Sequence, residues 1–183
     1  LDSMTRLIGQ ASERHADIVV FPELAVTGAM VDDVARVDKT ALRDALETIR
    51  SQAQRYGIAV VFGMPHIEDD RRWNSAFVIG PEGNLLTRYD QMVVDRHDLF
   101  EEGSAPKGMW FRVKGVPAIV TVGADARWNE IGELAAVRGA RRADAKPRTR
   151  IAATPARGRG GARKTGRTAT AANSGGGVSP KLA

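Results

Sequence analysis

The sequence predicts a layered α/β domain with a mixed sheet. Two short runs of β-branched apolar residues are typical of buried strands, and amphipathic helical patterns alternate with them. Two pairs of strand-like segments are each separated by turn residues, as in hairpins. Strands that alternate with helices and continue into hairpins favour a sheet of parallel and antiparallel strands covered by helices.

The first half of the chain is expected to contain two helices and two buried strands. In the helices, apolar residues recur every three or four positions. The expected helices span residues 3–15 and 41–55, and the expected strands span residues 17–21 and 58–65. Each strand is expected to end at a proline, because proline has no N–H for the ladder of a central strand.

The second half is expected to contain two hairpins and a third helix. The first hairpin pairs residues 74–79 with 85–89, and the second pairs residues 109–114 with 117–122. A helix over residues 128–138 is indicated by apolar residues at helical spacing.

The last 43 residues differ in composition from the rest of the chain. Residues 1–140 carry 16 Lys or Arg and 21 Asp or Glu, whereas residues 141–183 carry 11 Lys or Arg and one Asp. The latter segment also holds seven Gly, three Pro and no aromatic residue. Such a segment buries too little apolar area to offset its ordering entropy. We therefore expect one domain over residues 1–140 and a disordered basic tail over residues 141–183.

Composition excludes several classes of function. The sequence contains no Cys, which rules out disulfides, thiolate metal sites and a cysteine nucleophile. No run approaches 18 uninterrupted apolar residues, and the first residues do not have the pattern of a signal peptide. We expect a cytoplasmic protein with no membrane contact, no cofactor and no bound metal.

Three segments in order resemble the nitrilase superfamily of carbon–nitrogen hydrolases. They correspond to the family's Phe-Pro-Glu-Leu turn after a strand, its Tyr-x-Lys segment after a Gly-Asn hairpin, and its strand-Cys-Tyr-Asp segment leading into a helix. In this chain they are Phe21–Leu24 with Thr27-Gly28, Gly83-Asn84 with Tyr89–Gln91, and Val122–Glu130. The resemblance covers about residues 1–140 and implies part of a four-layer α-β-β-α sandwich. Because the chain lacks the family's first and last strands, we interpret it as a fragment or a disrupted reading frame.

The resemblance also implies which residues belong to the site. In the family a Cys thiolate attacks an amide or nitrile carbon, a Glu is the general base, and a Lys stabilises the oxyanion. Glu23 occupies the general-base position. Gln91 occupies the oxyanion-Lys position, and Gly123 occupies the nucleophile position. The three are expected to meet at one cavity, with a small void or a water in place of the thiol.

Two of the three catalytic side chains are therefore substituted, which predicts a catalytically inactive homologue. One alternative is an active amidase or carbamoylase of small compounds that uses another nucleophile, with Thr121 and Ser104 as hydroxyl candidates. A second alternative is nucleic-acid binding through basic, Gly-rich tail segments such as residues 156–161, which lack aromatics for base stacking.

The resemblance further implies what the domain would contact. A small amide or carbamoyl compound is the expected ligand of the pocket. A homo-oligomer is a further expectation, because members of the family commonly dimerise through sheet-edge and helix contacts. Nucleic acid is expected as a partner only if the tail binds it.

Overall fold

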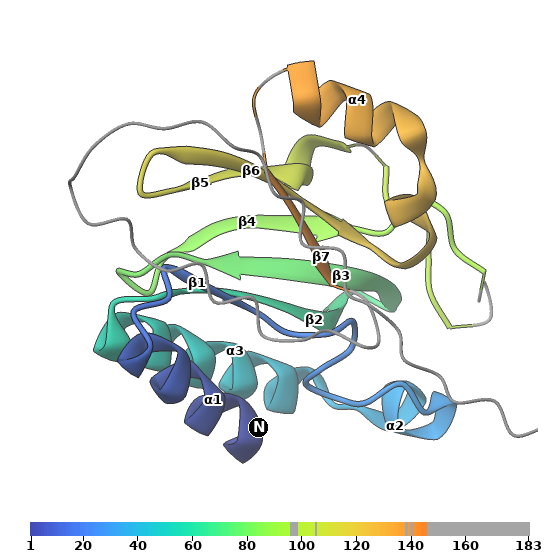
Figure 1. Cartoon of the computed structure of the whole chain (residues 1–183). Coiled ribbons are helices and arrows are strands. Elements are labelled where there is room, and N and C mark those ends of the chain that lie inside the picture. Colours follow the sequence, from blue (N-terminus) through green and yellow to red (C-terminus); the bar gives the residue numbers. More distant parts are fainter. Residues whose placement is uncertain (96–98, 105, 138, 140, 146–183) are drawn as a thin grey trace, which may run out of the picture.

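Four layers build the domain in the computed structural model, which describes residues 1–95, 99–104, 106–137, 139 and 141–145. Helices α1 and α3 cover one face of a four-stranded sheet, a three-stranded sheet lies on its other face, and α4 lies outside the second sheet (Figure 1). This is the α-β-β-α order that the sequence resemblance implies, and it confirms the predicted mixed α/β class. The tail expected to be disordered lies, from residue 146 onward, outside the described residues.

The predicted helices and strands follow one another in the expected order, and the structure contains further short elements between and after them. The α-helices are α1 (Asp2–Glu13), α2 (Val31–Arg36), α3 (Lys39–Tyr56) and α4 (Asn129–Val137), and two short 3-10 helices are η1 (Pro106–Met109) and η2 (Gly123–Arg127). The strands are β1 (Ile18–Val20), β2 (Ala59–Glu68), β3 (Arg71–Ile79), β4 (Leu85–Asp90), β5 (Trp110–Val113), β6 (Val116–Val122) and β7 (Arg141–Ala145).

Each sheet combines parallel and antiparallel pairs. The first sheet has the order β1-β2-β3-β4, with β1 parallel to β2 and the other neighbours antiparallel. The second has the order β5-β6-β7, with β5 antiparallel and β7 parallel to β6. The carboxyl ends of β1 and β6 each lead into a segment with polar residues, and both segments contribute to the candidate site.

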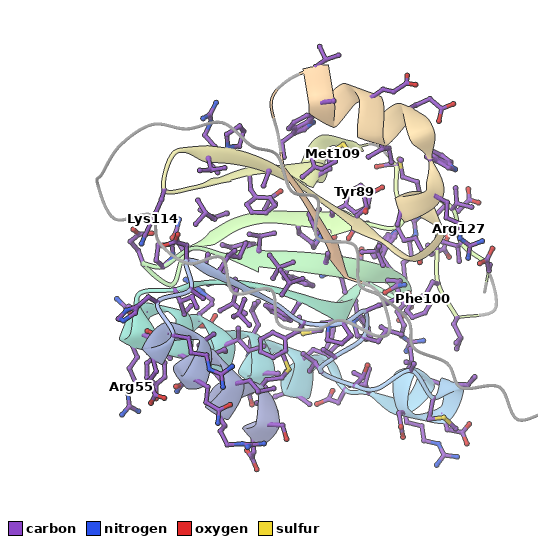
Figure 2. All side chains as sticks on the ribbon, in the orientation of Figure 1. Arg55, Tyr89, Phe100, Met109, Lys114 and Arg127 are labelled. Carbon is purple, nitrogen blue, oxygen red and sulfur yellow. The ribbon has the colours of Figure 1, made fainter. Side chains whose placement is uncertain are left out.

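The continuous apolar run of β2 is explained by burial on both faces. Val60 and Phe62 pack towards α1 and α3, whereas Ala59 and Val61 pack between the two sheets. Side chains alternate between the faces of a strand, so a strand with a core on each side needs apolar residues at every position. Tyr89 lies in the layer between the sheets and is fully buried (Figure 2).

The prediction that the second strand ends at its proline was wrong. Strand β2 continues through Pro65 to Glu68 and forms a hairpin with β3, in which Glu68 pairs with Arg71. β1 pairs with β2 only over Ala59–Val61. On that side β2 has no strand partner at its proline, so the missing N–H costs no ladder hydrogen bond there.

Two elements were not expected from the sequence. Helix α2 has only six residues, and its buried Val34 packs with Leu24, Val94 and Phe100, so tertiary contacts stabilise a segment with no helical periodicity of its own. Strand β7 lies inside the predicted disordered tail, and it corrects the expected boundary at residue 140. Its backbone pairs with β6, a contact that does not require the apolar pattern by which strands are found in a sequence.

Gly63 allows the turn after β1 to lie directly on β2. The Gly63 N–H donates to the Pro22 carbonyl at 3.1 Å, and the Val26 N–H donates to the Gly63 carbonyl at 3.4 Å. A Cβ at position 63 would lie 2.4 Å from the backbone nitrogen of Leu24 and 2.6 Å from the Cα of Glu23. The turn that carries Glu23 therefore depends on the absence of a side chain at this position.

We expect Gly63→Ala to destabilise the fold and displace the turn that carries Glu23. The added methyl would contact backbone atoms that cannot rotate away, at a cost of about 2–3 kcal/mol in the free energy of unfolding. Urea denaturation measures this cost. Gly57→Ala is the matched control, because its left-handed φ of 59° adds backbone strain while a Cβ there meets nothing within 4 Å. The control should lose only about 1 kcal/mol, and an equal loss in both variants would contradict the close approach at Gly63.

Candidate functional site

The three residues that the resemblance assigned to the site line one cavity of about 500 Å³. Glu23 lies on the turn after β1, Gln91 directly follows β4, and Gly123 directly follows β6. The two sheets thus place three chain segments, far apart in the sequence, around the same space.

Asn74 links Glu23 to Gln91. Its side chain is 2% exposed and lies in β3, next to β4. Asn74 Nδ2 donates to Glu23 Oε1 at 2.5 Å and to Gln91 Oε1 at 2.7 Å. The backbone pairs as well, because the Gln91 N–H donates to the Asn74 carbonyl at 2.9 Å. The residue at position 91 is therefore held by both its main chain and its side chain.

The direction of these hydrogen bonds is fixed by a backbone carbonyl. Gln91 Nε2 donates to the Val93 carbonyl at 2.7 Å, so the amide oxygen of Gln91 must face Asn74. Asn74 consequently presents its NH2 group to Gln91 and to Glu23 Oε1, which acts as an acceptor. Any proton on the Glu23 carboxyl therefore belongs on Oε2.

The environment of Glu23 favours the protonated form. Burial raises the pKa of Glu23 above its ordinary value, and the negative charges of Asp125 and Asp95 raise it further. The hydrogen bond from Asn74 acts in the opposite direction but is outweighed by burial. A carboxyl of this kind keeps its proton at Oε2 to a higher pH than a solvated carboxyl does.

Asp125 ties the segment after β4 to the segment after β6. Its carboxylate is fully buried and accepts hydrogen bonds from the Tyr89 hydroxyl at 2.7 Å, the Met92 N–H at 2.7 Å and the Val93 N–H at 2.8 Å. Burial and the neighbouring Asp125 raise the pKa of Tyr89, which therefore remains a donor. The carboxylate fixes the backbone of residues 92–93, and Val93 in turn holds the amide of Gln91.

Gly123 lies against the amide of Gln91. Its φ of 54° is in the left-handed region, and a Cβ built there would lie 2.6 Å from Gln91 Nε2. Gly123 also lines the cavity, and the Gln91 amide lies within contact distance of the place where a side chain would begin. A residue with a side chain at position 123 would require Gln91 to move.

The rest of the cavity is largely apolar. Residues from α2 and from the segment after β4 form one wall, together with Leu24 of the turn after β1; they are Leu24, Val34, Val94, Leu99 and Phe100. Asp95 and Arg127 also line the cavity, and both are exposed. Figure 2 shows Arg127 and Phe100 at the same end of the molecule. The cavity thus combines a polar floor with an apolar wall and a charged rim.

The hydroxyl candidates lie elsewhere. Thr121 is buried within β6 and Ser104 is exposed, and neither is among the described residues that line the cavity. Among the described residues, no three His, Asp or Glu side chains are grouped closely enough to hold a metal ion.

Sequence reasoning missed the role of Asn74. The sequence feature that could have indicated this role is a polar residue, Asn74, at the start of the buried part of a strand. Asp125 belongs to the third of the motif segments, Val122–Glu130, and the structure shows that it holds the backbone of residues 92–93. Neither role follows from spacing alone, because each depends on strand register and on contact between segments distant in the sequence.

The layered sheets and the carboxyl–amide cavity at their strand ends define a carbon–nitrogen hydrolase fold. The carbon-nitrogen hydrolase family model matches residues 1–137. The chain therefore belongs to this family.

Relatives of this chain include amidases and glutamine-dependent NAD(+) synthetases. The chain is 26% identical over 129 residues to 2-oxoglutaramate amidase of Bacillus subtilis (strain 168), and the match covers 66% of this chain and 48% of that protein. It is 30% identical over 131 residues to a glutamine-dependent NAD(+) synthetase of Xylella fastidiosa (strain Temecula1 / ATCC 700964), covering 68% of this chain and 24% of the synthetase. The chain thus spans about half or less of the length of these relatives.

Solved structures with the same fold include amidases of the nitrilase superfamily. One is a cysteine-to-alanine mutant of the amidase from Nesterenkonia sp. AN1 in complex with butyramide. It superposes with a TM-score of 0.72 at 24% sequence identity and covers 79% of this chain and 57% of the amidase. Within the described part of this chain, no helix is long and apolar enough to cross a membrane.

The raised pKa of Glu23 predicts a pH-dependent effect of Glu23→Gln on stability. Above the ordinary carboxyl value of 4.5, the native state retains a proton that the unfolded chain releases, so stability falls as pH rises through the native pKa. The Gln variant has no such proton to lose and keeps an acceptor for Asn74. We expect its free energy of unfolding to exceed that of the wild type at pH 8, with the difference shrinking towards pH 4. Urea denaturation across this range measures it, and a difference that does not vary with pH would contradict the raised pKa.

Proposed function

We propose that this domain binds a small aliphatic amide in the Glu23 cavity without hydrolysing it. The observation that carries this proposal is that Gln91 and Gly123 lie side by side in the cavity. The family's reaction needs a cation at the position of Gln91 and a thiol at the position of Gly123. Gln91 is a neutral amide, and Gly123 has no side chain. The whole sequence contains no Cys that could replace the nucleophile.

The remaining groups cannot complete the acyl-transfer reaction. Glu23 can exchange a proton at Oε2. In the family's reaction, however, the general base activates a thiol, and this chain contains no thiol. Gln91 is a neutral donor, and Nε2 is already engaged with the Val93 carbonyl. It therefore offers no positive charge to a tetrahedral oxyanion. The described residues at positions 91 and 123 thus supply neither the thiol nor the cation that the family's reaction uses there.

The same cavity retains what amide binding requires. Glu23 Oε2 supplies a polar group next to the floor of the cavity, and it can accept from an amide NH2 when ionised or donate to an amide oxygen when protonated. The wall formed by Val34, Val94, Leu99 and Phe100 can cover a short alkyl chain. The amidase from Nesterenkonia sp. AN1 in which cysteine is replaced by alanine is in complex with butyramide, so loss of the thiol is compatible with amide binding in that protein.

Butyramide should bind to the purified chain and remain intact. Calorimetry should show tighter binding of butyramide than of acetamide by about tenfold, because two additional CH2 groups are buried against the apolar wall. Val94→Ala should weaken butyramide binding by about fivefold through lost apolar contact. Val116→Ala, at an exposed position outside the cavity, is the matched control and should have no effect.

An ammonia assay on the same samples tests the absence of turnover. Release of ammonia from butyramide or a carbamoyl compound that disappears in Glu23→Ala would show an active hydrolase and overturn the proposal. Absence of butyramide binding would overturn it equally.

Catalysis should return only when both substituted positions are changed. Gly123→Cys alone would place a Cβ 2.6 Å from Gln91 Nε2, and Gln91→Lys alone would lack a nucleophile. The double variant Gly123→Cys/Gln91→Lys supplies a thiol and a cation beside Glu23, which act as a unit. We expect ammonia release, or alkylation of the thiol by iodoacetamide at an elevated rate, in the double variant well above that in either single variant. Equal activity in a single variant would contradict the assignment of these two positions.

A further inference from the structure

A second cavity lies on the helix-facing side of the first sheet and takes no part in the site described above. It has a volume of about 560 Å³, and none of its lining residues lines the Glu23 cavity. Three elements contribute most of its walls: the first two turns of α3, the distal part of β2, and β4. Its size is that of pockets that hold small molecules.

The cavity exists because the helices do not cover the whole sheet. Helix α3 packs mainly on β2 and to a lesser extent on β3, and β4 forms the edge of this sheet beyond them. Leu85 at the start of β4 lines the cavity and is 46% exposed. The buried Leu42, Met64 and Phe77 provide an apolar floor.

The charged residues that line this cavity are all basic. Lys39, Arg43 and Arg88 line it, and no Asp or Glu is among its described lining residues. Arg88 is bound to the Asp90 carboxylate at 3.1 Å, so it contributes little net charge. Lys39 and Arg43 are exposed, and the only described ion pair of Arg43 is a 3.4 Å contact with the exposed Asp44, of a kind that solvent weakens strongly. Lys39 and Arg43 therefore remain able to bind an anion.

His66 does not add to this charge at neutral pH. Its Nε2 lies 2.6 Å from Arg88 Nη1, a distance at which the imidazole must be the acceptor. Burial and the charge of Arg88 lower the pKa of His66 accordingly. The imidazole thus keeps the Arg88 side chain in place as a wall of the cavity.

The start of α3 lies at the basic side of this cavity. Lys39 and Thr40 of its first turn line the cavity. The N-cap residue Asp38 is acidic, so its charge offsets the positive end of the helix dipole even though its side chain makes no capping hydrogen bond. The preference for an anion therefore comes from the side chains of Lys39 and Arg43 rather than from the helix terminus.

From the basic rim and the apolar floor together, we propose that this second cavity binds an aliphatic monocarboxylate. The carboxylate lies at Lys39 and Arg43, and the alkyl chain lies over Leu42, Met64 and Phe77 against Leu85. This site is independent of amide binding at Glu23.

Calorimetric titration of the full chain with sodium octanoate tests the proposal. Octanoate should bind. Acetate lacks the alkyl chain and octylamine carries the opposite charge, so each should bind at least tenfold more weakly. A loss of about 1.4 kcal/mol in binding free energy is sufficient for that factor. Lys39→Gln/Arg43→Gln should weaken octanoate binding by about tenfold. Both residues are exposed, so this variant should keep the wild-type unfolding midpoint.

The matched control removes the same amount of charge elsewhere. Arg14→Gln/Arg55→Gln changes two exposed arginines, the second at the opposite end of α3 (Figure 2), and should leave octanoate binding unchanged. Saturating butyramide should also leave it unchanged, which separates this site from the Glu23 cavity. The proposal is overturned if octanoate does not bind, if acetate or octylamine binds equally well, if both charge variants behave alike, or if butyramide competes.

Discussion

The arrangement of the candidate site depends on one buried carboxylate. Asp125 lies just after β6 in the second sheet, and its three hydrogen-bond donors come from the end of β4 in the first sheet and the two-residue segment beyond it. A buried carboxylate without donors would be costly, and so would three buried donors without an acceptor. The two sheets are therefore held in one relative position at the strand ends. Gly123 meets Gln91 because this position is fixed, whereas Asn74 and Gln91 are already joined by the pairing of β3 with β4.

A second constraint acts within the first sheet. Gly63 lets the backbone of the Glu23 turn lie on β2, and this contact brings the carboxyl to the level of Asn74. The cavity is thus defined by main-chain contacts more than by its own side chains. Side-chain changes at positions 91 and 123 would leave these main-chain contacts in place.

Local patterns in the sequence predicted the layers but not the details that depend on neighbours. The β-branched residues of β2 predicted a strand, but the predicted strand was too short. Pro65 can lie within β2 because β1 pairs only with Ala59–Val61 and does not extend to the proline. Helix α2 and strand β7 have no strong periodicity and are stabilised by contacts distant in the sequence. For the site, the motif resemblance located Glu23, Gln91 and Gly123. The link through Asn74 required knowledge of the register between β3 and β4.

The left-handed backbone at Gly123 restricts which residues the turn after β6 can carry. Any other residue at a φ of 54° would carry a conformational penalty of about 1–2 kcal/mol. It would also displace the side-chain amide of Gln91, because a Cβ would lie 2.6 Å from Gln91 Nε2. The residue at position 123 is thus coupled to the side-chain conformation at position 91, and libraries that vary one of these positions should vary the other at the same time.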